Sequence, residues 1–345
     1  MDQKQVNHVT IDEIAARAGV SKTTVSRYLN NGSVSEEKRE RIRAIIEETG
    51  YTPSRRAQDL RRGTSRTIGV LLPQIDSERI GRIVAGISQV LEEQDFQLLL
   101  ATTGSHIDRE LAYLSYFKND QVDGILFIPD RLTPKHEEAI LSSTVPVVII
   151  GQKTSYASCV YHDEYASARE LTELLLRTGN QKIGILSMTM RSTAVGSERL
   201  RGFYAALEQY GLTVKAPWLI RTGAGIGDGY AACRKLLQKH PDVEAVLCST
   251  DQLAIGAIKY LREQNKRIPA DVAVAGMGHD HLSEFITPRL TTVHYAYKTS
   301  GMEAARILLQ ILDNEIDLHK QFQLGYRIIE QETTERAESD TDTAS

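Results

Sequence analysis

Residues 9–31 read VTIDEIAARAGVSKTTVSRYLNN, and this stretch decides the fold of the amino-terminal part of the chain. Thr10 is followed three residues later by Glu13, which is the capping-box pattern that begins a helix. Gly19 is a stop signal for that helix, because glycine readily adopts the left-handed conformation found at helix ends. The next helix is therefore expected only a few residues further on, across a tight turn.

A second and a third helix follow this turn. Ser21 is a suitable N-cap for the second helix, in which Val25 and Leu29 lie four residues apart and face inward. Ser35 is the N-cap expected for the third helix, and Gly50 marks its end. The apolar face of the third helix consists of Ile42, Ile45 and Ile46. Three short helices, of which the first two are joined by a glycine turn, indicate a helix-turn-helix.

The second helix presents hydroxyl and cationic side chains to the solvent, namely Lys22, Thr23, Ser26 and Arg27. In a helix-turn-helix this helix enters the major groove of DNA, where hydroxyls reach phosphates and Lys or Arg reads guanine edges. The sequence therefore predicts a DNA-binding head over residues 1–53. The alternative interpretation is an ordinary solvated face on a small helical bundle.

The run AGVSKTTVSR resembles the DNA-binding head of the lactose-repressor (LacI/GalR) family of bacterial transcription regulators. The similarity extends over most of the chain. It implies that operator bases are read by Lys22, Thr23 and Arg27. It implies further that phosphates are contacted by Thr10, Ser21, Thr24 and Ser26.

An arginine-rich segment, residues 54–66, follows the head. A helix this short is marginal in water, and its like charges repel until phosphates neutralise them. We expect it to be disordered in the free protein and helical on DNA, as the hinge helix of the similar family is. The resemblance places DNA contacts at Arg55, Ala57 and Leu60, with Leu60 as a wedge that kinks the duplex from the minor groove. The alternative is a flexible basic linker.

The pattern then changes to apolar strands separated by amphipathic helices. Near-continuous apolar runs such as IGVLLP, FQLLLA, DGILFIP and VPVVIIG suit parallel strands buried on both faces. The runs KIGILSM, AVLCST and VAVAGMG continue this alternation, which predicts a doubly wound α/β core over residues 67–331. The resemblance implies two similar subdomains like those of periplasmic sugar-binding proteins, with a cleft between them. Residues 332–345 are acidic and aperiodic, which predicts a disordered tail.

Ligands of open α/β sheets bind beyond the carboxyl ends of the strands. This rule and the family resemblance together select the candidate effector-binding residues Asp76, Gln152, Arg199, Thr250, Asp251, His279, Asp280 and Tyr297. Arg199 begins an R-x-x-G-F motif similar to the family's effector motif, and a guanidinium fork takes two sugar hydroxyls or a phosphate in one plane. A surface salt bridge is the alternative role for Arg199, although neighbouring Arg201 suits that role better.

The block STDQLAIGA is similar to a further family element, and this resemblance implies that Thr250 faces the ligand. Asp251 serves either the site or the start of the following helix, where a carboxylate is favourable in any case. The resemblance places Tyr297 where the family often has an aromatic ring against the sugar. Plain core packing is the alternative for this tyrosine.

Two positions depart from the pattern of sugar-responsive family members. These often have an aspartate directly after a glycine-aromatic pair, whereas this chain reads GMGHD, with Asp280 shifted. Gly151 stands where an aspartate often follows the fourth strand. The departures leave open which sugar binds and whether it is phosphorylated. The blocks CVYHDE, LCSTDQLAIGAIKYL and VHYAY are similar to the trehalose operon repressor branch.

The distribution of charge favours a head that meets a polyanion. Residues 1–66 contain 13 Lys and Arg against 9 Asp and Glu, whereas the remainder contains 28 against 36. The chain has three dispersed cysteines, Cys159, Cys233 and Cys248, which fit a reducing compartment. The polar amino terminus does not have the pattern of a secretory signal, and no apolar run is long enough to span a membrane. These features predict a cytoplasmic protein.

Motifs of catalysis are absent from the sequence: it contains no G-x-S-x-G, G-x-x-x-x-G-K-[ST], H-E-x-x-H or C-x-x-C. We therefore expect neither an enzyme nor a cofactor. The glycine cluster GAGIGDG at 223–229 follows no convincing strand, and a surface turn before a helix at Tyr230 is the better interpretation. For His279 and His281 beside Asp280, loop polarity or hydrogen bonding to a sugar is a better interpretation than a metal site.

These features together predict a homodimeric repressor of a carbohydrate-utilisation operon that binds a pseudo-palindromic operator in double-stranded DNA. A sugar or sugar-phosphate effector would favour the conformation with low DNA affinity and so release the operator. Two alternatives stay open: a regulator whose ligand tightens DNA binding, and a sugar-binding protein without a regulatory role. The carboxyl terminus has no leucine heptads that would support a tetramer, which favours a dimer.

Overall fold

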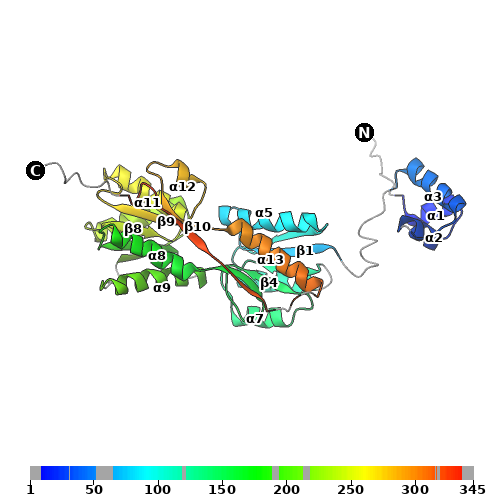
Figure 1. The fold of residues 1–345 in the computed structure, drawn as a ribbon, viewed down its shortest axis with the longest axis horizontal. Coiled ribbons are helices and arrows are strands. Elements are labelled where there is room, and N and C mark those ends of the chain that lie inside the picture. Colours follow the sequence, from blue (N-terminus) through cyan, green and yellow to red (C-terminus); the bar gives the residue numbers. More distant parts are fainter. Residues whose placement is uncertain are drawn as a thin grey trace, which may run out of the picture. The chain divides into compact units, whose positions relative to one another are not determined.

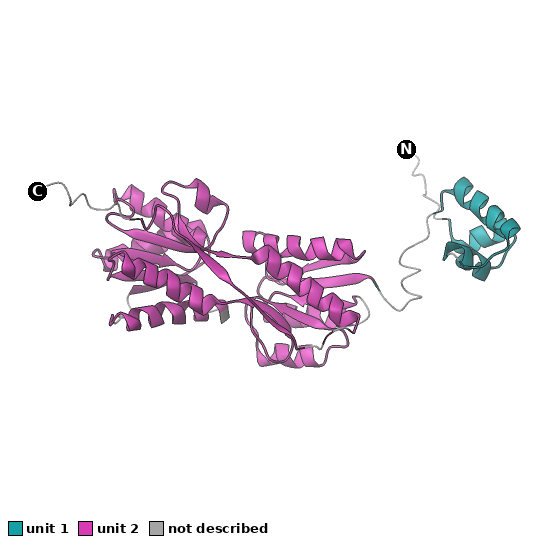
Figure 2. Ribbon diagram, in the orientation of Figure 1, with its two compact units in different colours: residues 1–65 teal, residues 66–345 magenta. Residues whose placement is uncertain are grey.

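The computed structural model describes residues 9–30, 32–51, 65–118, 122–188, 194–212, 218–314, 316 and 319–335. The chain divides into two compact units, residues 1–65 and residues 66–345 (Figure 2). The predicted DNA contacts at Arg55, Ala57 and Leu60 lie outside the described residues. Within the described residues, no helix has both the length and the apolar character needed to cross a membrane.

Unit 1 contains the helices α1 (Ile11–Ala18), α2 (Lys22–Leu29) and α3 (Glu36–Thr49). Thr10 Oγ1 accepts a hydrogen bond from Glu13 N at 3.3 Å, and Ser21 Oγ accepts one from Thr24 N at 3.2 Å. Both predicted N-caps are therefore formed. Gly19 ends α1 with a φ of 64°, the left-handed conformation in which glycine carries no steric penalty.

The helices of unit 1 enclose a small apolar core. Ile14, Val25 and Ile42 are fully buried, one from each helix, and Leu29 packs partly buried against them. Ser35 occupies the N-cap position of α3, as predicted, but its side chain makes no capping hydrogen bond. Two glutamates in the first turn of α3 favour the helix start instead, because negative charge is stabilised at a helix N-terminus.

Unit 2 consists of two twisted sheets with helices packed on them (Figure 1). Within the described residues, the strand orders are β11-β5-β4-β3-β1-β2 and β12-β10-β9-β8-β6-β7, and only β12 is antiparallel to its neighbour. The strands of the first sheet are β1 (Thr67–Leu72), β2 (Gln97–Thr102), β3 (Gly124–Phe127), β4 (Val147–Ile150), β5 (Ser158–His162) and β11 (Gln321–Leu324). Those of the second are β6 (Ile183–Met188), β7 (Leu219–Thr222), β8 (Ala245–Cys248), β9 (Ala273–Gly278), β10 (Thr291–Tyr295) and β12 (Tyr326–Ile329).

Each sheet and its helices form one lobe of unit 2. The first lobe contains α5 (Glu78–Glu93), α6 (Ile107–Lys118), α7 (Pro134–Leu141) and α13 (Tyr297–Leu312). The second lobe contains α8 (Glu164–Arg177), α9 (Ala194–Gln209), α10 (Ile226–Lys239), α11 (Asp251–Glu263) and α12 (Leu282–Phe285). The chain crosses between the lobes after β5, after β10 and between β11 and β12. Apart from β11 and β12, the two sheets have the same strand order, as expected for two similar doubly wound subdomains.

Several strands were not expected from the sequence. β5, β7, β11 and β12 were missed, and three of them (β7, β11 and β12) are largely half-exposed, so they lack a continuous apolar run. β2 was expected to be buried on both faces, but it is the edge strand of its sheet, and Leu99 is 40% exposed. An edge strand needs apolar residues on only part of its surface, which the run FQLLLA does not reveal.

The interpretation of the glycine cluster at 223–229 was partly wrong, although residues 223–225 form the predicted turn before a helix. β7 directly precedes this cluster, and α10 begins at Ile226 rather than at Tyr230. A Cβ on Gly229 would lie 2.2 Å from Leu253 O, and a Cβ on Gly256 would lie 2.0 Å from Ile226 O. Gly229 and Gly256 are therefore required because α10 and α11 pack backbone against backbone.

The folded body extends past the predicted boundary at residue 332. Thr333 and Thr334 are buried, and Thr291 N donates a hydrogen bond to Thr333 Oγ1 at 2.8 Å. Thr333 N donates to Arg289 O at 3.0 Å. The segment looks like a polar tail in the sequence because threonine hydroxyls are hydrophilic, but their hydrogen bonds are satisfied inside the second lobe.

Candidate functional site

The exposed face of α2 carries the residues predicted to read DNA. Lys22, Thr23 and Arg27 are exposed, whereas Ser26 is half-buried, because Val25 holds the opposite face of the helix in the core. Lys22 Nζ lies 2.6 Å from Asp12 Oδ1 in a pair that is more than half exposed. Such a pair contributes little, so a phosphate or a base edge can replace Asp12.

The hydroxyls of the head combine capping with a second hydrogen-bonding capacity. Ser21 Oγ lies 2.7 Å from Thr23 Oγ1 and 2.9 Å from Thr24 Oγ1, in addition to capping α2. Thr10 Oγ1 accepts from a backbone N–H, so its own O–H remains available as a donor. Thr10 and Ser21 stand at helix N-termini, where backbone amides and the helix dipole favour a phosphate.

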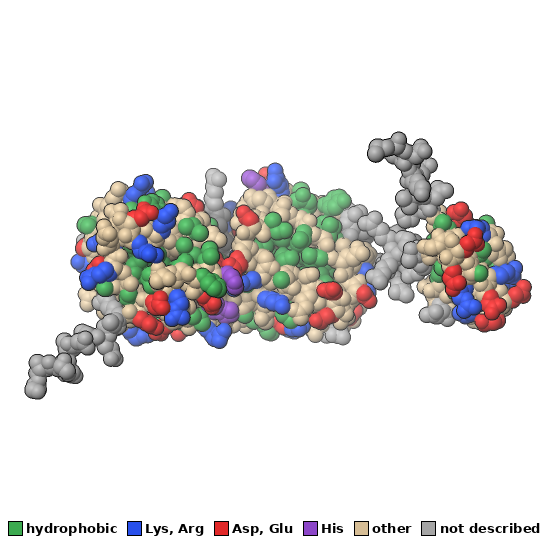
Figure 3. Space-filling model, turned by 90° about the horizontal axis from the view of Figure 1, so that it is seen from above, with side chains coloured by type: hydrophobic (Ala, Val, Ile, Leu, Met, Phe, Trp, Pro, Cys, Tyr) green, Lys and Arg blue, Asp and Glu red, His purple; other side chains and the backbone are tan. Residues whose placement is uncertain are grey.

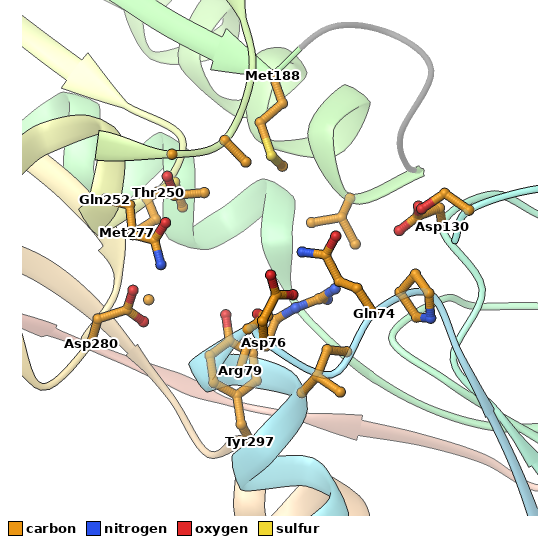
Figure 4. Close-up of a pocket in the computed structure, with 18 of the residues that line it drawn as sticks. Gln74, Asp76, Arg79, Asp130, Met188, Thr250, Gln252, Met277, Asp280 and Tyr297 are labelled. Carbon is orange, nitrogen blue, oxygen red and sulfur yellow. The ribbon is translucent and has the colours of Figure 1, made fainter. Parts of the chain in front are cut away.

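A cavity of about 400 Å³ lies between the two lobes of unit 2. Five of the predicted effector residues line it: Asp76, Arg199, Thr250, Asp280 and Tyr297. Figure 4 shows Thr250 and Asp280 on one side of the cavity and Gln74 and Asp130 on the other. Gln152, Asp251 and His279 do not line it.

Arg199 is held inside the second lobe. It is 5% exposed, its Nε donates to Glu164 Oε2 at 2.7 Å, and its Nη1 donates to Ser249 O. Its guanidinium carbon lies 5.1 Å from the centre of the Tyr295 ring. Burial acts to lower the pKa of Arg199, but the Glu164 carboxylate together with Tyr295 and Tyr297 keeps this pKa above its ordinary value.

Part of the guanidinium fork is therefore occupied by the protein itself, which corrects the expectation of a fork free for two sugar hydroxyls. The alternative of a surface salt bridge is also wrong for Arg199. Arg201 takes that role, since its Nη1 lies 2.7 Å from the carboxylate of Glu198 in an exposed pair.

Glu164, Tyr295 and Tyr297 surround Arg199, and of these three only Tyr297 lines the cavity itself. Burial acts to raise the pKa of Glu164, but Arg199 outweighs it and lowers the pKa. Burial raises the pKa of Tyr297 to about 12, so this residue lines the cavity as a neutral phenol. The ring of His162 contacts the edges of Tyr295 and Tyr297, and burial lowers its pKa to about 4. Near neutral pH, His162 and Tyr297 are therefore neutral and Glu164 is ionised, so the buried groups around Arg199 keep one protonation state.

Asp251 does not line the cavity but binds the turn that carries Asp280. It is fully buried, its Oδ1 accepts from Thr292 Oγ1 at 2.5 Å, and its Oδ2 accepts from Asp280 N at 2.7 Å. It is also the first residue of α11, as one of the two alternatives predicted. Burial raises the pKa of Asp251 to about 7. Asp251 is therefore a positioning residue for the turn that carries Asp280.

A strained turn brings Asp280 into the cavity. Gly278 has a φ of 145° and His279 a φ of 53°, both in the range that favours glycine. His279 does not line the cavity; its Nδ1 lies 3.0 Å from His294 Nδ1, and its Nε2 lies 3.0 Å from Glu284 Oε1. The expectation for His279 is therefore wrong, while the shifted Asp280 reaches the ligand space. Burial, followed by the charge of Glu78, raises the pKa of Asp280.

Gln152 braces a neighbouring loop instead of facing the cavity. Its Nε2 donates to Pro129 O at 2.8 Å, and its Oε1 accepts from Leu132 N at 3.3 Å. It borders a separate pocket that also includes Arg131 and Lys153. An amide with its donor and acceptor both satisfied by backbone is a structural residue, which its position after a strand did not reveal.

Several lining residues were missed. Asp130 follows β3, so the strand-end rule would have selected it. Arg79 lies in the first turn of α5, and Gln252 next to Asp251. Glu164 does not line the cavity but holds Arg199, and the sequence did not indicate this role because the two residues are 35 positions apart. Among the described residues, no group of three or more His, Cys, Asp or Glu is placed to hold a metal ion.

Comparison with known proteins agrees with this architecture. Residues 65–337 match the family model "Periplasmic binding proteins and sugar binding domain of LacI family", and residues 10–54 match "Bacterial regulatory proteins, lacI family". The chain is 31% identical over 306 residues to the sucrose operon repressor of Staphylococcus xylosus, covering 89% of this chain and 94% of that one. It is 28% identical over 324 residues to catabolite control protein A of Priestia megaterium, covering 93% and 98% of the two chains.

Two solved structures are similar over nearly the whole length. The transcriptional regulator CelR in its cellobiose complex has a TM-score of 0.73 and 28% identity, covering 94% of this chain and 99% of that one. The Lac repressor dimer bound to operator has a TM-score of 0.85, covering 94% and 99%. The second likeness, at 24% identity, concerns the fold alone.

Proposed function

Because the chain belongs to the LacI family of bacterial regulatory proteins, we propose that it represses a carbohydrate-utilisation operon and that a sugar releases it from its operator. The observation that carries the proposal is the capped helix α2, which exposes Lys22, Thr23 and Arg27 in the same chain as a cavity between two lobes. The chain acts in the cytoplasm as a regulator and not as an enzyme.

The head binds the operator through α2. Lys22, Thr23 and Arg27 read base edges in the major groove, with the arginine fork suited to a guanine. Phosphates are contacted by Thr10, Ser21, Thr24 and Ser26. In this role the caps of α1 and α2 use their acceptor for the helix and their O–H for the phosphate.

The chain acts as a homodimer on a pseudo-palindromic operator. The second lobe exposes Leu282 (51%) and Phe285 (71%) on α12. A groove beside them is lined by Ile255 and Ile258 of α11 and by Ile286. Apolar side chains of this size are commonly exposed where a partner covers them, and a second copy is the partner that a palindrome requires.

The charges of the cavity favour an unphosphorylated sugar. Asp76, Asp130 and Asp280 line it, against Arg79 as a cation that forms no ion pair among the described residues. The charge of Arg199 is offset by the buried Glu164. A phosphate would meet this net negative lining, whereas sugar hydroxyls donate hydrogen bonds to carboxylates. The relatives named for sucrose and cellobiose support the same ligand class.

The sugar acts by shifting a conformational population. It contacts residues of both lobes, so it favours one relative orientation of the lobes. Release of DNA requires that the sugar bind the conformation of low operator affinity more tightly than the other, because equal binding shifts nothing.

The test is binding of an operator fragment, taken from the DNA upstream of the gene, during titration with sugars and their 6-phosphates. Arg27→Ala should weaken operator binding by about 1–3 kcal/mol, while Arg43→Ala, an exposed arginine on α3, should not. One unphosphorylated sugar should release the wild-type complex. Tighter binding with a ligand would establish the co-repressor mechanism instead, and equal effects of the two arginine variants would overturn the assignment of α2.

A further inference from the structure

The two lobes touch directly beside the cavity through α5 and the turn at residues 279–281. Both carboxylate oxygens of Glu78 lie 3.0 Å from His281 N, which donates to them. Arg82 Nη1 donates to His279 O at 3.0 Å. Glu78 and Arg82 are also paired with each other, one helical turn apart. In Figure 3, histidine, acidic and basic side chains gather along the line where the two lobes meet.

These contacts alternate with residues that line the cavity. On α5, Arg79 lines the cavity, whereas Glu78 and Arg82 reach the opposite lobe. On the turn, Asp280 lines the cavity, whereas the backbone of its two neighbours meets α5. A displacement of either segment therefore moves a ligand-facing side chain and a contact between the lobes together.

The turn is also fixed from its own side. His279 N donates to Thr292 Oγ1 at 3.2 Å, and Asp280 N donates to Asp251 Oδ2 at 2.7 Å. The turn consequently follows the second lobe as a rigid part, while Glu78 and Arg82 follow the first. Opening of the lobes at this end must break the contacts of Glu78 and Arg82, because these contacts join the two lobes. The partners of the turn within the second lobe, Thr292 and Asp251, are fully buried and move with it.

We propose that Glu78 and Arg82 form a latch that holds the two lobes together at the Asp280 turn and thereby sets the affinity of the cavity for its ligand. The part of this inference that concerns the ligand rests on the proposed function. The latch contacts main-chain atoms of the turn, so its contacts depend on where the backbone of the turn lies and not on the identity of the turn's side chains.

The latch lowers the free-energy cost of binding the ligand in the cavity. A ligand that bridges Arg79 and Asp280 needs the two segments at their present separation, and the latch provides that separation beforehand. Without it, part of the binding energy is used to bring the lobes together. We expect the double variant Glu78→Ala/Arg82→Ala to bind the sugar about tenfold more weakly, the size of effect expected for two charge-assisted hydrogen bonds that are partly exposed.

The first test needs no ligand. Spin labels on cysteines replacing Asp108 on α6 and Lys235 on α10 report the separation of the lobes, since both positions are exposed and the native cysteines are buried. Labelled protein is diluted with unlabelled protein so that distances within one chain dominate. The double variant should give a broader and longer distance distribution than the wild type. Glu93→Ala, at the exposed far end of α5, should not.

A distribution unchanged in the double variant would overturn the latch, whatever the ligand is. Glu78→Gln is a second variant that keeps an oxygen acceptor for His281 N, so it should retain a narrow distribution and most of the affinity. If the distribution broadens but sugar affinity is unchanged, the latch exists and its coupling to the ligand is wrong. Failure of every sugar to bind the wild type would instead overturn the proposed function and leave the distance result standing.

Discussion

The two lobes of unit 2 share one strand order but differ in how they hold the charged residues at and beneath the cavity. In the second lobe, Arg199, Glu164 and Asp251 are buried and bonded to one another or to backbone. In the first lobe, Asp76 and Asp130 stand at strand ends without an ion pair among the described residues. The same scaffold thus supplies a rigid floor from one lobe and an adaptable wall from the other. A cavity that must both recognise a ligand and report its presence needs both properties.

The largest expected effect on stability comes from removing Glu164, the counter-ion of Arg199. Glu164→Ala leaves the buried charge of Arg199 without its counter-ion, which should lower the free energy of unfolding by about 3–5 kcal/mol. Urea denaturation measures this. Glu198→Ala breaks the exposed pair with Arg201 and is the matched control, expected to change stability far less. Equal losses in both variants would mean that the buried pair is no part of a rigid floor.

The second expected effect is that the free energy of unfolding depends on pH through the titration of Asp251. Its pKa is raised from 3.8 to about 7, so the folded protein keeps a proton that the unfolded chain releases above pH 4. This contribution to stability is fully present below pH 4 and is lost as the pH rises to about 7, by an amount of the order of a few kcal/mol. Asp251→Asn should remove this slope from urea unfolding measured between pH 4.5 and 7.5.

The surface residue Asp271 provides a control, because its pKa is shifted in the opposite direction to that of Asp251. The hydrogen bond from Arg267 lowers the pKa of Asp271 to about 2, so its contribution is lost only as the pH falls from about 4 toward 2. Asp271→Asn should leave the slope between pH 4.5 and 7.5 unchanged. A wild-type slope that persists in the Asp251 variant would place the titrating group elsewhere.

The third effect tests what the lobes have in common. Each lobe packs a helix pair through glycine: Gly86 of α5 faces α13, and Gly229 of α10 faces α11. An added Cβ would lie 2.0 Å from Lys298 O in the first case and 2.2 Å from Leu253 O in the second. Alanine at either position should cost about 1–3 kcal/mol of unfolding free energy. Gly227→Ala, where no atom lies within 4 Å, should not destabilise.

Sequence patterns predicted the fold where the physical signal is local. Capping residues, glycine stops and apolar runs located α1, α2 and the buried strands other than β5, because each of these is fixed by a few neighbouring residues. The edge strand β2 and the close packing at Gly229 depend on which elements become neighbours in space. The site divides in the same way: Asp280 was found from its strand end, but the ion pair of Arg199 with Glu164 joins residues 35 positions apart and left no pattern.

The smallest effect on stability, and the sharpest test of the adaptable wall, is expected from Asp76→Asn. Asp76 is exposed and forms no ion pair among the described residues, so the free energy of unfolding should change by less than about 0.5 kcal/mol. Sugar-induced release from the operator should nevertheless need a higher concentration, because an amide is a weaker acceptor for sugar hydroxyls than a carboxylate. Asp108→Asn, exposed on the same lobe outside the cavity, is the control for both measurements. If Asp76→Asn destabilises the fold as Glu164→Ala does, the first lobe also holds its charges in a rigid network, and the contrast between the lobes disappears.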